Sequence, residues 1–236
     1  MVADAIIYHP SVAHYLRYIA TTVGRDKLLR TLQYFSRFYA WYLLRTNGTP
    51  AQIKPFEVIK KQFGLSRKLL RVGKNVEHFK AAATAADQKG GDSLLKYCAV
   101  GRQLAYGVYL SLDTVSYLDT TGIRSLPAPT SKRLLRAAQR AWLTGLLFNT
   151  ISGIYTLIHL SQKSRLVNKT DGEGVVEGKK IERERAAARL QLLSDLCDMT
   201  VPGTALGFVG LDDGVVGIAG TVSSLIGMVG VWRKTA

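Results

Sequence analysis

Basic side chains set into an apolar helix are the residues of this sequence with the clearest chemistry. Residues 56–80, FEVIKKQFGLSRKLLRVGKNVEHFK, contain seven Lys or Arg residues against two acidic residues, Glu57 and Glu77. On a helical wheel at about 100° per residue, most of the cations gather on a narrow face opposite a wide apolar face. The cationic face suits phosphate groups and the apolar face suits acyl chains, so this segment can lie in a membrane interface.

Two other placements of this helix stay open from its sequence alone. Its apolar face can pack on a soluble core and leave a solvated basic surface, or the helix can bind a calmodulin-like partner or nucleic acid. Gly64 and Gly73 each lower intrinsic helicity by about 1 kcal/mol relative to Ala. We therefore expect a helix that is marginal in water and forms fully on a surface.

Charge and apolar character separate along the chain that must position this segment. The 236 residues carry 32 Lys or Arg and 17 Asp or Glu, and the net charge of +15 predicts attraction to anionic surfaces. Residues 1–140 hold 22 of the basic and 8 of the acidic residues, whereas residues 141–236 hold 10 and 9. The basic part and the apolar part are therefore different parts of the chain.

Two apolar segments are long enough to cross a bilayer. Residues 141–160 contain no Asp, Glu, Lys or Arg, and at about 1.5 Å per residue they reach about 30 Å, the thickness of a bilayer core. Residues 214–232 are also uncharged, and Trp232, Arg233 and Lys234 form an interfacial anchor at their end. Both segments are predicted to be transmembrane helices, with a fully buried core helix as the alternative for residues 141–160.

A third apolar segment, residues 94–118, carries charges within it, including Arg102 and Asp113. Arg102 and Asp113 lie on the side of this helix opposite its apolar stripe. Charges inside a spanning helix are costly unless they are paired or line a cavity. The segment is therefore predicted to be half-embedded or packed in a bundle, and a third membrane span is the alternative.

Small residues recur at intervals of three or four near the C-terminus and predict close helix–helix packing. The residues assigned to this glycine seam are Gly203, Gly207, Gly210, Gly214 and Gly217. A phosphate-binding loop is not expected, because no strand precedes these glycines and no GK[ST] or GxGxxG motif is present.

Motifs for catalysis and for cofactor or metal binding are missing from the sequence. Cys98 and Cys197 lie far apart without a CxxC pair, and there is no nucleophile elbow and no HExxH motif. We therefore expect no enzymatic activity, no cofactor and no metal site. Nucleic-acid binding is not expected as the main role.

These patterns predict an all-α membrane protein with amphipathic N-terminal helices and hydrophobic C-terminal helices. Its six expected regions are an amphipathic helical region (1–93), an apolar bundle or embedded helix (94–122), a basic linker (123–140), a transmembrane helix (141–160), a polar charged loop and helix (161–202), and a Gly-rich transmembrane helix with a basic tail (203–236).

The chain resembles the peroxin-11 family, and a fungal member in particular, at residues 24–43, GRDKLLRTLQYFSRFYAWYL. Members of this family are peroxisomal membrane proteins that drive elongation and division of the organelle. The resemblance continues through the basic segment KPFEVIKKQFGLSRKLLRVGKNVEHFKAA, a polar link, and hydrophobic segments that end close to the C-terminus. It covers essentially the whole chain.

The resemblance implies peroxisomal membrane remodelling, in which the amphipathic helix enters one leaflet, curves and elongates the membrane, and promotes peroxisome proliferation and fission. It also implies a peroxisomal membrane location with both termini in the cytosol. The implied partners are anionic phospholipid, further copies of the chain as a homo-oligomer, and dynamin-related GTPases with their fission adaptors. A pore or carrier for small metabolites in the same membrane is the alternative, with Arg102 and Asp113 as its polar lining.

Site residues follow from the resemblance position by position. The residues expected to bind lipid headgroups are Lys60, Lys61, Arg67, Lys68, Arg71 and Lys74. The residues expected to insert into the leaflet are Ile59, Phe63, Leu65, Leu69, Leu70, Val72 and Val76.

Overall fold

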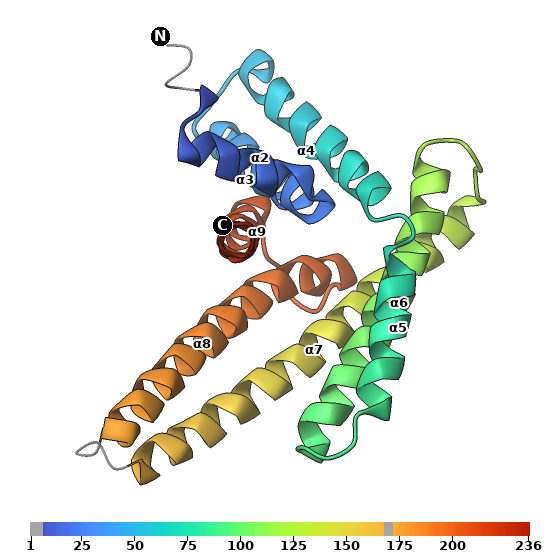
Figure 1. Cartoon of the computed structure of the whole chain (residues 1–236). Helices are drawn as coiled ribbons and strands as arrows, with labels where there is room; N and C mark the ends of the chain where they lie inside the picture. Colours follow the sequence, from blue (N-terminus) through green and yellow to red (C-terminus); the bar gives the residue numbers. More distant parts are fainter. Residues whose placement is uncertain (1–6, 168–171) are drawn as a thin grey trace. The chain divides into compact units, whose positions relative to one another are not determined.

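The computed structural model describes residues 7–167 and 172–236, and this part of the chain is built of α-helices and contains no β-strand (Figure 1). The predicted all-α fold class is therefore confirmed. The helices are α2 (Pro10–Ala20), α3 (Thr22–Arg45), α4 (Pro50–Leu70), α5 (Lys74–Asp87), α6 (Ser93–Thr120), α7 (Ala128–Leu166), α8 (Gly172–Leu206) and α9 (Asp213–Lys234). They form two compact units: unit 1 comprises Met1–Leu70 and Gly210–Ala236, and unit 2 comprises Arg71–Val209.

Helix α3 is the centre of unit 1, because α4 and α9 both pack along it. The contacts with α9 run antiparallel: Gly214 of α9 lies against Trp41 of α3, and Gly227 lies against Lys27. Helix α9 therefore lies against α3 over most of its length. Any environment that surrounds α9 must also reach the outer side of α3.

Unit 2 is a run of four helices in which each helix packs on the next. The ring of Tyr109 on α6 stacks on that of Trp142 on α7, with the ring centres 5.5 Å apart. Tyr109, Leu110 and Ala138 form a buried cluster at this contact. The connections are short, as expected for antiparallel neighbours in a helical bundle.

The helix predicted over residues 56–80 is interrupted in the structure. Helix α4 ends at Leu70 and α5 begins at Lys74, and Gly73 between them adopts a φ of 81°. This left-handed conformation is easily adopted by glycine and rarely by other residues. The second glycine of the segment therefore ends the helix, so that α4 belongs to unit 1 and α5 to unit 2.

Most of the expected basic linker is helical, because residues 128–140 form the first turns of α7. Pro129 lies in the first turn of this helix, where its missing N–H leaves no hydrogen bond unmade. Asp119 closes the short connection from α6 by accepting hydrogen bonds from the Ser131 hydroxyl and, at 2.8 Å, from the Leu126 amide. These two hydrogen bonds lower the pKa of the Asp119 carboxyl.

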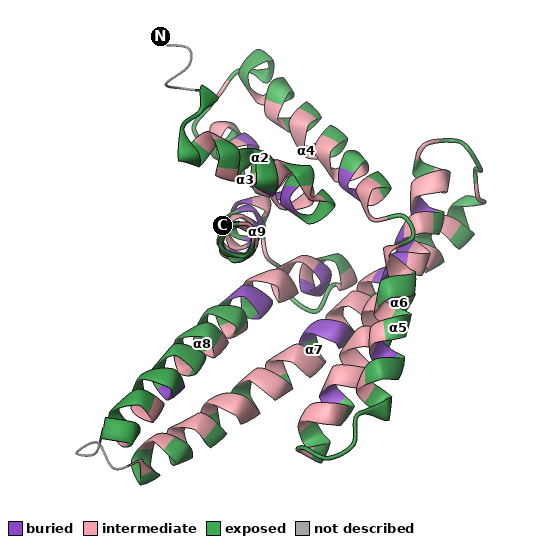
Figure 2. Ribbon diagram, viewed as in Figure 1, coloured by how far each residue is buried: buried purple, intermediate pink, exposed green. Residues whose placement is uncertain are grey.

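Few residues of the described chain are buried, and exposed residues occur on every helix (Figure 2). Among the described residues, 11 hydrophobic side chains are buried, whereas 37 large hydrophobic side chains are exposed and occur on every helix. Nine further buried residues are polar or charged, including Arg67, Asp113 and Asp195. Helices with apolar outer faces and paired charges between them are typical of a chain surrounded by lipid.

Candidate membrane-contact surface

Two helices of the described chain, α7 and α9, are long and apolar enough to cross a bilayer. They contain the predicted transmembrane segments 141–160 and 214–232. Within the apolar windows of these helices, only 11% of α7 and 33% of α9 is buried. A core helix of a soluble protein would be mostly covered, so the exposure of α7 argues against the buried alternative for residues 141–160.

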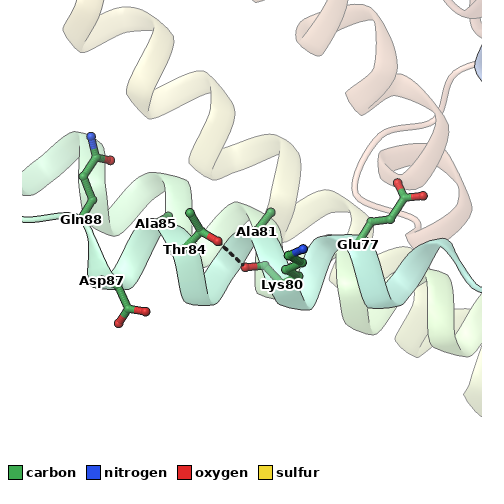
Figure 3. Close-up of a pocket in the computed structure, with 7 residues that line it drawn as sticks. All are labelled: Glu77, Lys80, Ala81, Thr84, Ala85, Asp87 and Gln88. Carbon is green, nitrogen blue, oxygen red and sulfur yellow. Dashed lines mark hydrogen bonds between the residues drawn. The ribbon is translucent and has the colours of Figure 1, made fainter.

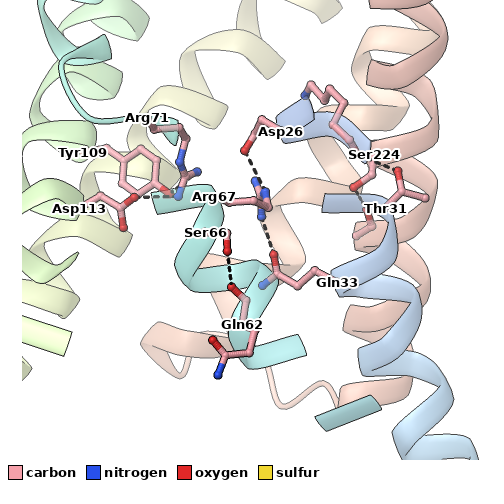
Figure 4. A network of polar contacts seen from close by, with 12 residues as sticks. Asp26, Thr31, Gln33, Gln62, Ser66, Arg67, Arg71, Tyr109, Asp113 and Ser224 are labelled. Carbon is pink, nitrogen blue, oxygen red and sulfur yellow. Dashed lines mark hydrogen bonds and ion pairs between the residues drawn. The ribbon is translucent and has the colours of Figure 1, made fainter. Parts of the chain in front are cut away.

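Helix α6, the third apolar segment, directs Arg102 and Asp113 toward other parts of unit 2. Arg102 Nη1 donates a hydrogen bond to Asn149 Oδ1 of α7 at 3.1 Å. Asp113 is 6% exposed and accepts a hydrogen bond from Arg71 Nη2 at 2.7 Å (Figure 4). Both contacts agree with the expectation of a bundle-packed helix, and α6 is not one of the two helices that could span.

The cationic face of α4 turns toward α3 within unit 1. Arg67 is 7% exposed; its Nε lies 3.0 Å from Asp26 Oδ1, and its Nη1 donates to Gln33 Oε1 at 2.7 Å (Figure 4). Lys60 Nζ lies 3.5 Å from a carboxylate oxygen of Asp213 at the start of α9. These two predicted headgroup ligands are therefore engaged inside unit 1 in this structure.

The corresponding face of α5 turns toward α6 within unit 2. Asn75 Nδ2 donates to Ser111 Oγ at 2.9 Å, and His78 Nδ1 lies 2.6 Å from Gln103 Oε1. Arg71, which immediately precedes α5, belongs to the same set of inward contacts through its ion pair with α6. Arg71, which the sequence placed toward headgroups, thus joins Asn75 and His78 in holding this segment to α6.

Exposed apolar residues lie on α4 in unit 1 and, separately, on α5 and the turn before it in unit 2, beside exposed polar residues such as Gln62 and Glu77. We call these apolar residues together the outer stripe. It consists of residues that are between 48% and 65% exposed: Val58, Leu69, Val72 and Val76. By helical spacing, Lys61 and Lys68 flank the outer stripe on α4. Lys61 is exposed and Lys68 is half-buried. An apolar strip with flanking lysines can bury carbon in the acyl region while the ammonium groups reach phosphate level.

The remaining predicted contact residues are neither fully buried nor exposed. The half-buried ones are Ile59, Phe63, Leu65, Leu70 and Lys74. The wheel separates a cationic from an apolar side of α4, but nothing in it shows which side meets the protein. Asp26, the single acidic residue of α3, was a signal in the sequence for the inward placement of Arg67.

Sequence reasoning missed a buried polar cluster in unit 2. The Asp195 carboxylate on α8 is 4% exposed and accepts hydrogen bonds from Asn149 Nδ2 and from Gln191 Nε2, all at 3.0 Å. Because Asn149 also accepts from Arg102, the cluster joins α6, α7 and α8. Its signal in the sequence was Asn149, the single amide side chain in the uncharged residues 141–160.

Replacing Asp195 by Leu is expected to destabilise unit 2, whereas Asp195→Asn is expected to have a small effect. The leucine removes the acceptor of the half-buried Asn149 amide, and an unsatisfied buried group costs about 1–3 kcal/mol. Thermal unfolding of the detergent-solubilised chain checks this expectation. Equal midpoints for Asp195→Leu and the unchanged chain would show that the cluster does not hold the three helices together.

The predicted glycine seam is divided between two helices and the loop that joins them. Gly203 lies in α8, Gly207 follows the end of α8 with a φ of 80°, and Gly210 lies before α9. The Phe208 amide donates to the Gly203 carbonyl at 2.9 Å, a hydrogen bond that closes the end of the helix. The sequence predicted one Gly-rich helix from residue 203 onward, but in the structure α8 ends at Leu206 and α9 begins at Asp213.

Gly214 and Gly217 do lie on one face of α9, and that face packs on α3 of the same chain. A Cβ on Gly214 would lie 2.6 Å from the ring of Trp41, and a Cβ on Gly217 would lie 2.6 Å from the backbone nitrogen of Phe38. The two glycines therefore serve helix packing within unit 1. We do not assign self-association to them.

A hollow on α5 is a shallow feature of a single helix. It is lined by Glu77, Lys80, Ala81, Thr84, Ala85, Asp87 and Gln88 (Figure 3). Thr84 donates to the Lys80 carbonyl at 3.0 Å, as hydroxyls inside helices commonly do. Within residues 7–167 and 172–236, no group of His, Cys, Asp and Glu is arranged to hold a metal ion.

Comparison with known proteins covers nearly the whole chain. Residues 12–232 match the family model described as peroxisomal biogenesis factor 11. Peroxisomal membrane protein PMP27 of Saccharomyces cerevisiae is 29% identical over the full length of both chains. Peroxisomal biogenesis factor 11 of Schizosaccharomyces pombe is 23% identical, with 97% of this chain and 98% of the relative covered. Peroxisomal membrane protein 11B of Homo sapiens is 22% identical, with 90% and 93% covered. No solved structure matches the chain.

Proposed function

This chain belongs to the peroxisomal biogenesis factor 11 family, and from that premise we propose that it remodels the peroxisomal membrane by inserting the outer stripe of α4 and α5 into one leaflet. The family resemblance predicted from the sequence is confirmed, and the relatives are named as peroxisomal membrane proteins. A place for this chain in the peroxisomal membrane follows from them. Elongation and curvature of that membrane are the further step proposed here.

The observation that carries the proposal is the outward direction of the outer stripe. Val58, Leu69 and Val76 are each about half exposed or more, beside lysines that can reach lipid phosphates. Side chains that enter one leaflet expand it relative to the other, and the bilayer relieves the difference by bending. Headgroup contact is assigned to Lys61, whose side chain is exposed, because Arg67 and Arg71 are held in ion pairs.

The proposed topology places both termini in the cytosol. His14 on α2 contacts the backbone of Trp232 at the C-terminal end of α9, so the two ends of the described chain meet within unit 1. The excess of Lys and Arg before α7 and at the end of α9 favours the cytosolic side for these regions.

Homo-oligomer formation and recruitment of dynamin-related GTPases with fission adaptors stay predictions from the family resemblance. The pore or carrier alternative relied on Arg102 and Asp113 as a polar lining. Both side chains instead make polar contacts within unit 2. No feature of the described residues favours solute passage over membrane elongation.

Replacing Leu69 or Val76 by Asp is expected to abolish membrane elongation without unfolding the chain. Both side chains are more than half exposed, so the core loses little, whereas an Asp within the acyl region costs about 2.5–3.5 kcal/mol on insertion scales. The measurement is tubule formation, seen by electron microscopy, in phosphatidylcholine and phosphatidylserine vesicles that contain the full chain.

Val176→Asp is the matched control, because Val176 is 69% exposed but lies on the polar end of α8. We expect this variant to form tubules like the unchanged chain. Normal tubules with Leu69→Asp and Val76→Asp would contradict leaflet insertion by the outer stripe.

A further inference from the structure

A second amphipathic helix, α2, is attached to the C-terminal end of α9 in unit 1. His14 Nε2 lies 2.9 Å from the carbonyl oxygen of Trp232, and the two rings are 3.8 Å apart. Arg17 Nε donates to the Thr235 carbonyl at 2.9 Å. The Thr235 amide and hydroxyl also donate to the Trp232 carbonyl, so α2 adds its contacts to a helix end that is already capped.

The turn between α2 and α3 sets the direction of α2. Thr21 is extended between the two helices; its hydroxyl donates to the Tyr18 carbonyl at 2.8 Å and accepts from the Gly24 amide at 2.9 Å. A Cβ on Gly24 would lie 2.2 Å from the Tyr18 oxygen, so glycine permits this close approach. Figure 1 looks almost along the axis of α9, and α2 runs across the view beside the C-terminal end of that helix. When α9 crosses a bilayer, α2 therefore lies close to the plane of the membrane.

The face of α2 that points away from α9 is apolar and aromatic. Tyr15 is 45% exposed and Leu16 is 55% exposed, and Val12 and Ile19 fall on the same face by their spacing of three and four. Tyr18, on the opposite face, is only 2% exposed. Helix α2 contains no Asp or Glu. A strongly amphipathic helix without acidic residues and with tyrosine on its apolar face is suited to the level of lipid headgroups.

We propose that α2 is a membrane-interface helix whose Tyr15 and Leu16 lie between the phospholipid headgroups and the upper acyl chains of the leaflet in which α9 ends. This inference rests on the proposed function through one premise, the crossing of the bilayer by α9. The occupant is lipid because α2 is held at the level of Trp232, Arg233 and Lys234. An aromatic residue followed by basic residues is typical of the end of a membrane span.

The test uses the full chain with Cys98 and Cys197 replaced by Ala, reconstituted in phosphatidylcholine and phosphatidylserine vesicles. A single cysteine is introduced as Leu16→Cys and labelled with an environment-sensitive fluorophore. Ala13→Cys is the matched control, because Ala13 is exposed on α2 but lies off the apolar face. Val229→Cys, at a position 42% exposed on α9, reports the span itself.

We expect lipids brominated near the headgroup to quench the label at Leu16→Cys several-fold more strongly than the label at Ala13→Cys, and aqueous iodide to show the opposite order. Equal iodide quenching at the two positions would overturn the inference. An apolar spectrum without lipid quenching would also overturn it, since protein would then cover the face. If lipid quenches the label at Val229→Cys but not at Leu16→Cys, the interfacial position of α2 is wrong while the span by α9 still holds. If lipid does not quench the label at Val229→Cys, the premise that α9 spans the bilayer is wrong.

Discussion

Gly217→Ala is expected to lower the thermal stability of the chain sharply and to abolish membrane elongation. The added Cβ would lie 2.6 Å from the backbone nitrogen and 2.7 Å from the Cα of Phe38. Backbone atoms of a helix cannot rotate away as a flexible side chain can, so α3 and α9 must separate. Overpacking of this kind costs about 1–3 kcal/mol and occasionally more. The midpoint of thermal unfolding in detergent and tubule formation in vesicles measure the two effects.

Gly230→Ala provides the control on the same helix, because a Cβ added at Gly230 would meet no atom of another described helix within 4 Å. We expect no loss of stability from that change, since alanine is the better helix former. Similar midpoints for the two variants would contradict the packing of α9 on α3. If instead the Gly217→Ala chain stays stable but no longer cross-links to a second copy, the glycines mediate self-association between copies of the chain.

Helix positions were predictable wherever a pattern ran uninterrupted. The uncharged residues 141–160 and 214–232 lie within α7 and α9, and the apolar residues 94–118 lie within α6. Their length and composition limit the alternatives, because few other structures satisfy the backbone of so long an apolar run. The ends of these helices were less predictable, since α7 continues back through the basic residues 128–140.

The sequence indicates which residues of α4 share a side of the helix, but it does not indicate which side turns outward. Hydrophobic periodicity shows that Arg67 and Leu69 lie on different sides of a helix, but the solvent decides which side turns outward. In water the apolar side would be covered; with lipid outside, the charged side is the one that needs partners. Asp26 and Asp113 supply those partners from other helices. Long-range pairs of this kind leave no periodic signal in a single sequence.

We expect the second large effect from removal of Asp26, the ion-pair partner of Arg67. In Asp26→Leu, the Arg67 guanidinium loses its ion pair at a site where it is only 7% exposed. Breaking a buried pair by removal of one member costs about 3–5 kcal/mol, whereas replacing both members by apolar residues is often neutral. We therefore expect Asp26→Leu to unfold at a much lower temperature, and the double variant Asp26→Leu with Arg67→Met to recover most of the loss.

Lys61→Met separates this structural role from binding of lipid. Lys61 lies on the same helix as Arg67, and its side chain is exposed beside the outer stripe. We expect Lys61→Met to keep the unfolding midpoint and to weaken binding to phosphatidylserine vesicles, with the largest difference at low salt, because salt screens the attraction between exposed charges. The opposite pattern, in which Arg67→Met alone keeps its stability and loses vesicle binding, would show that Arg67 contacts headgroups. The ion pair with Asp26 would then have to open on the membrane, and the outward face of α4 would be the cationic one.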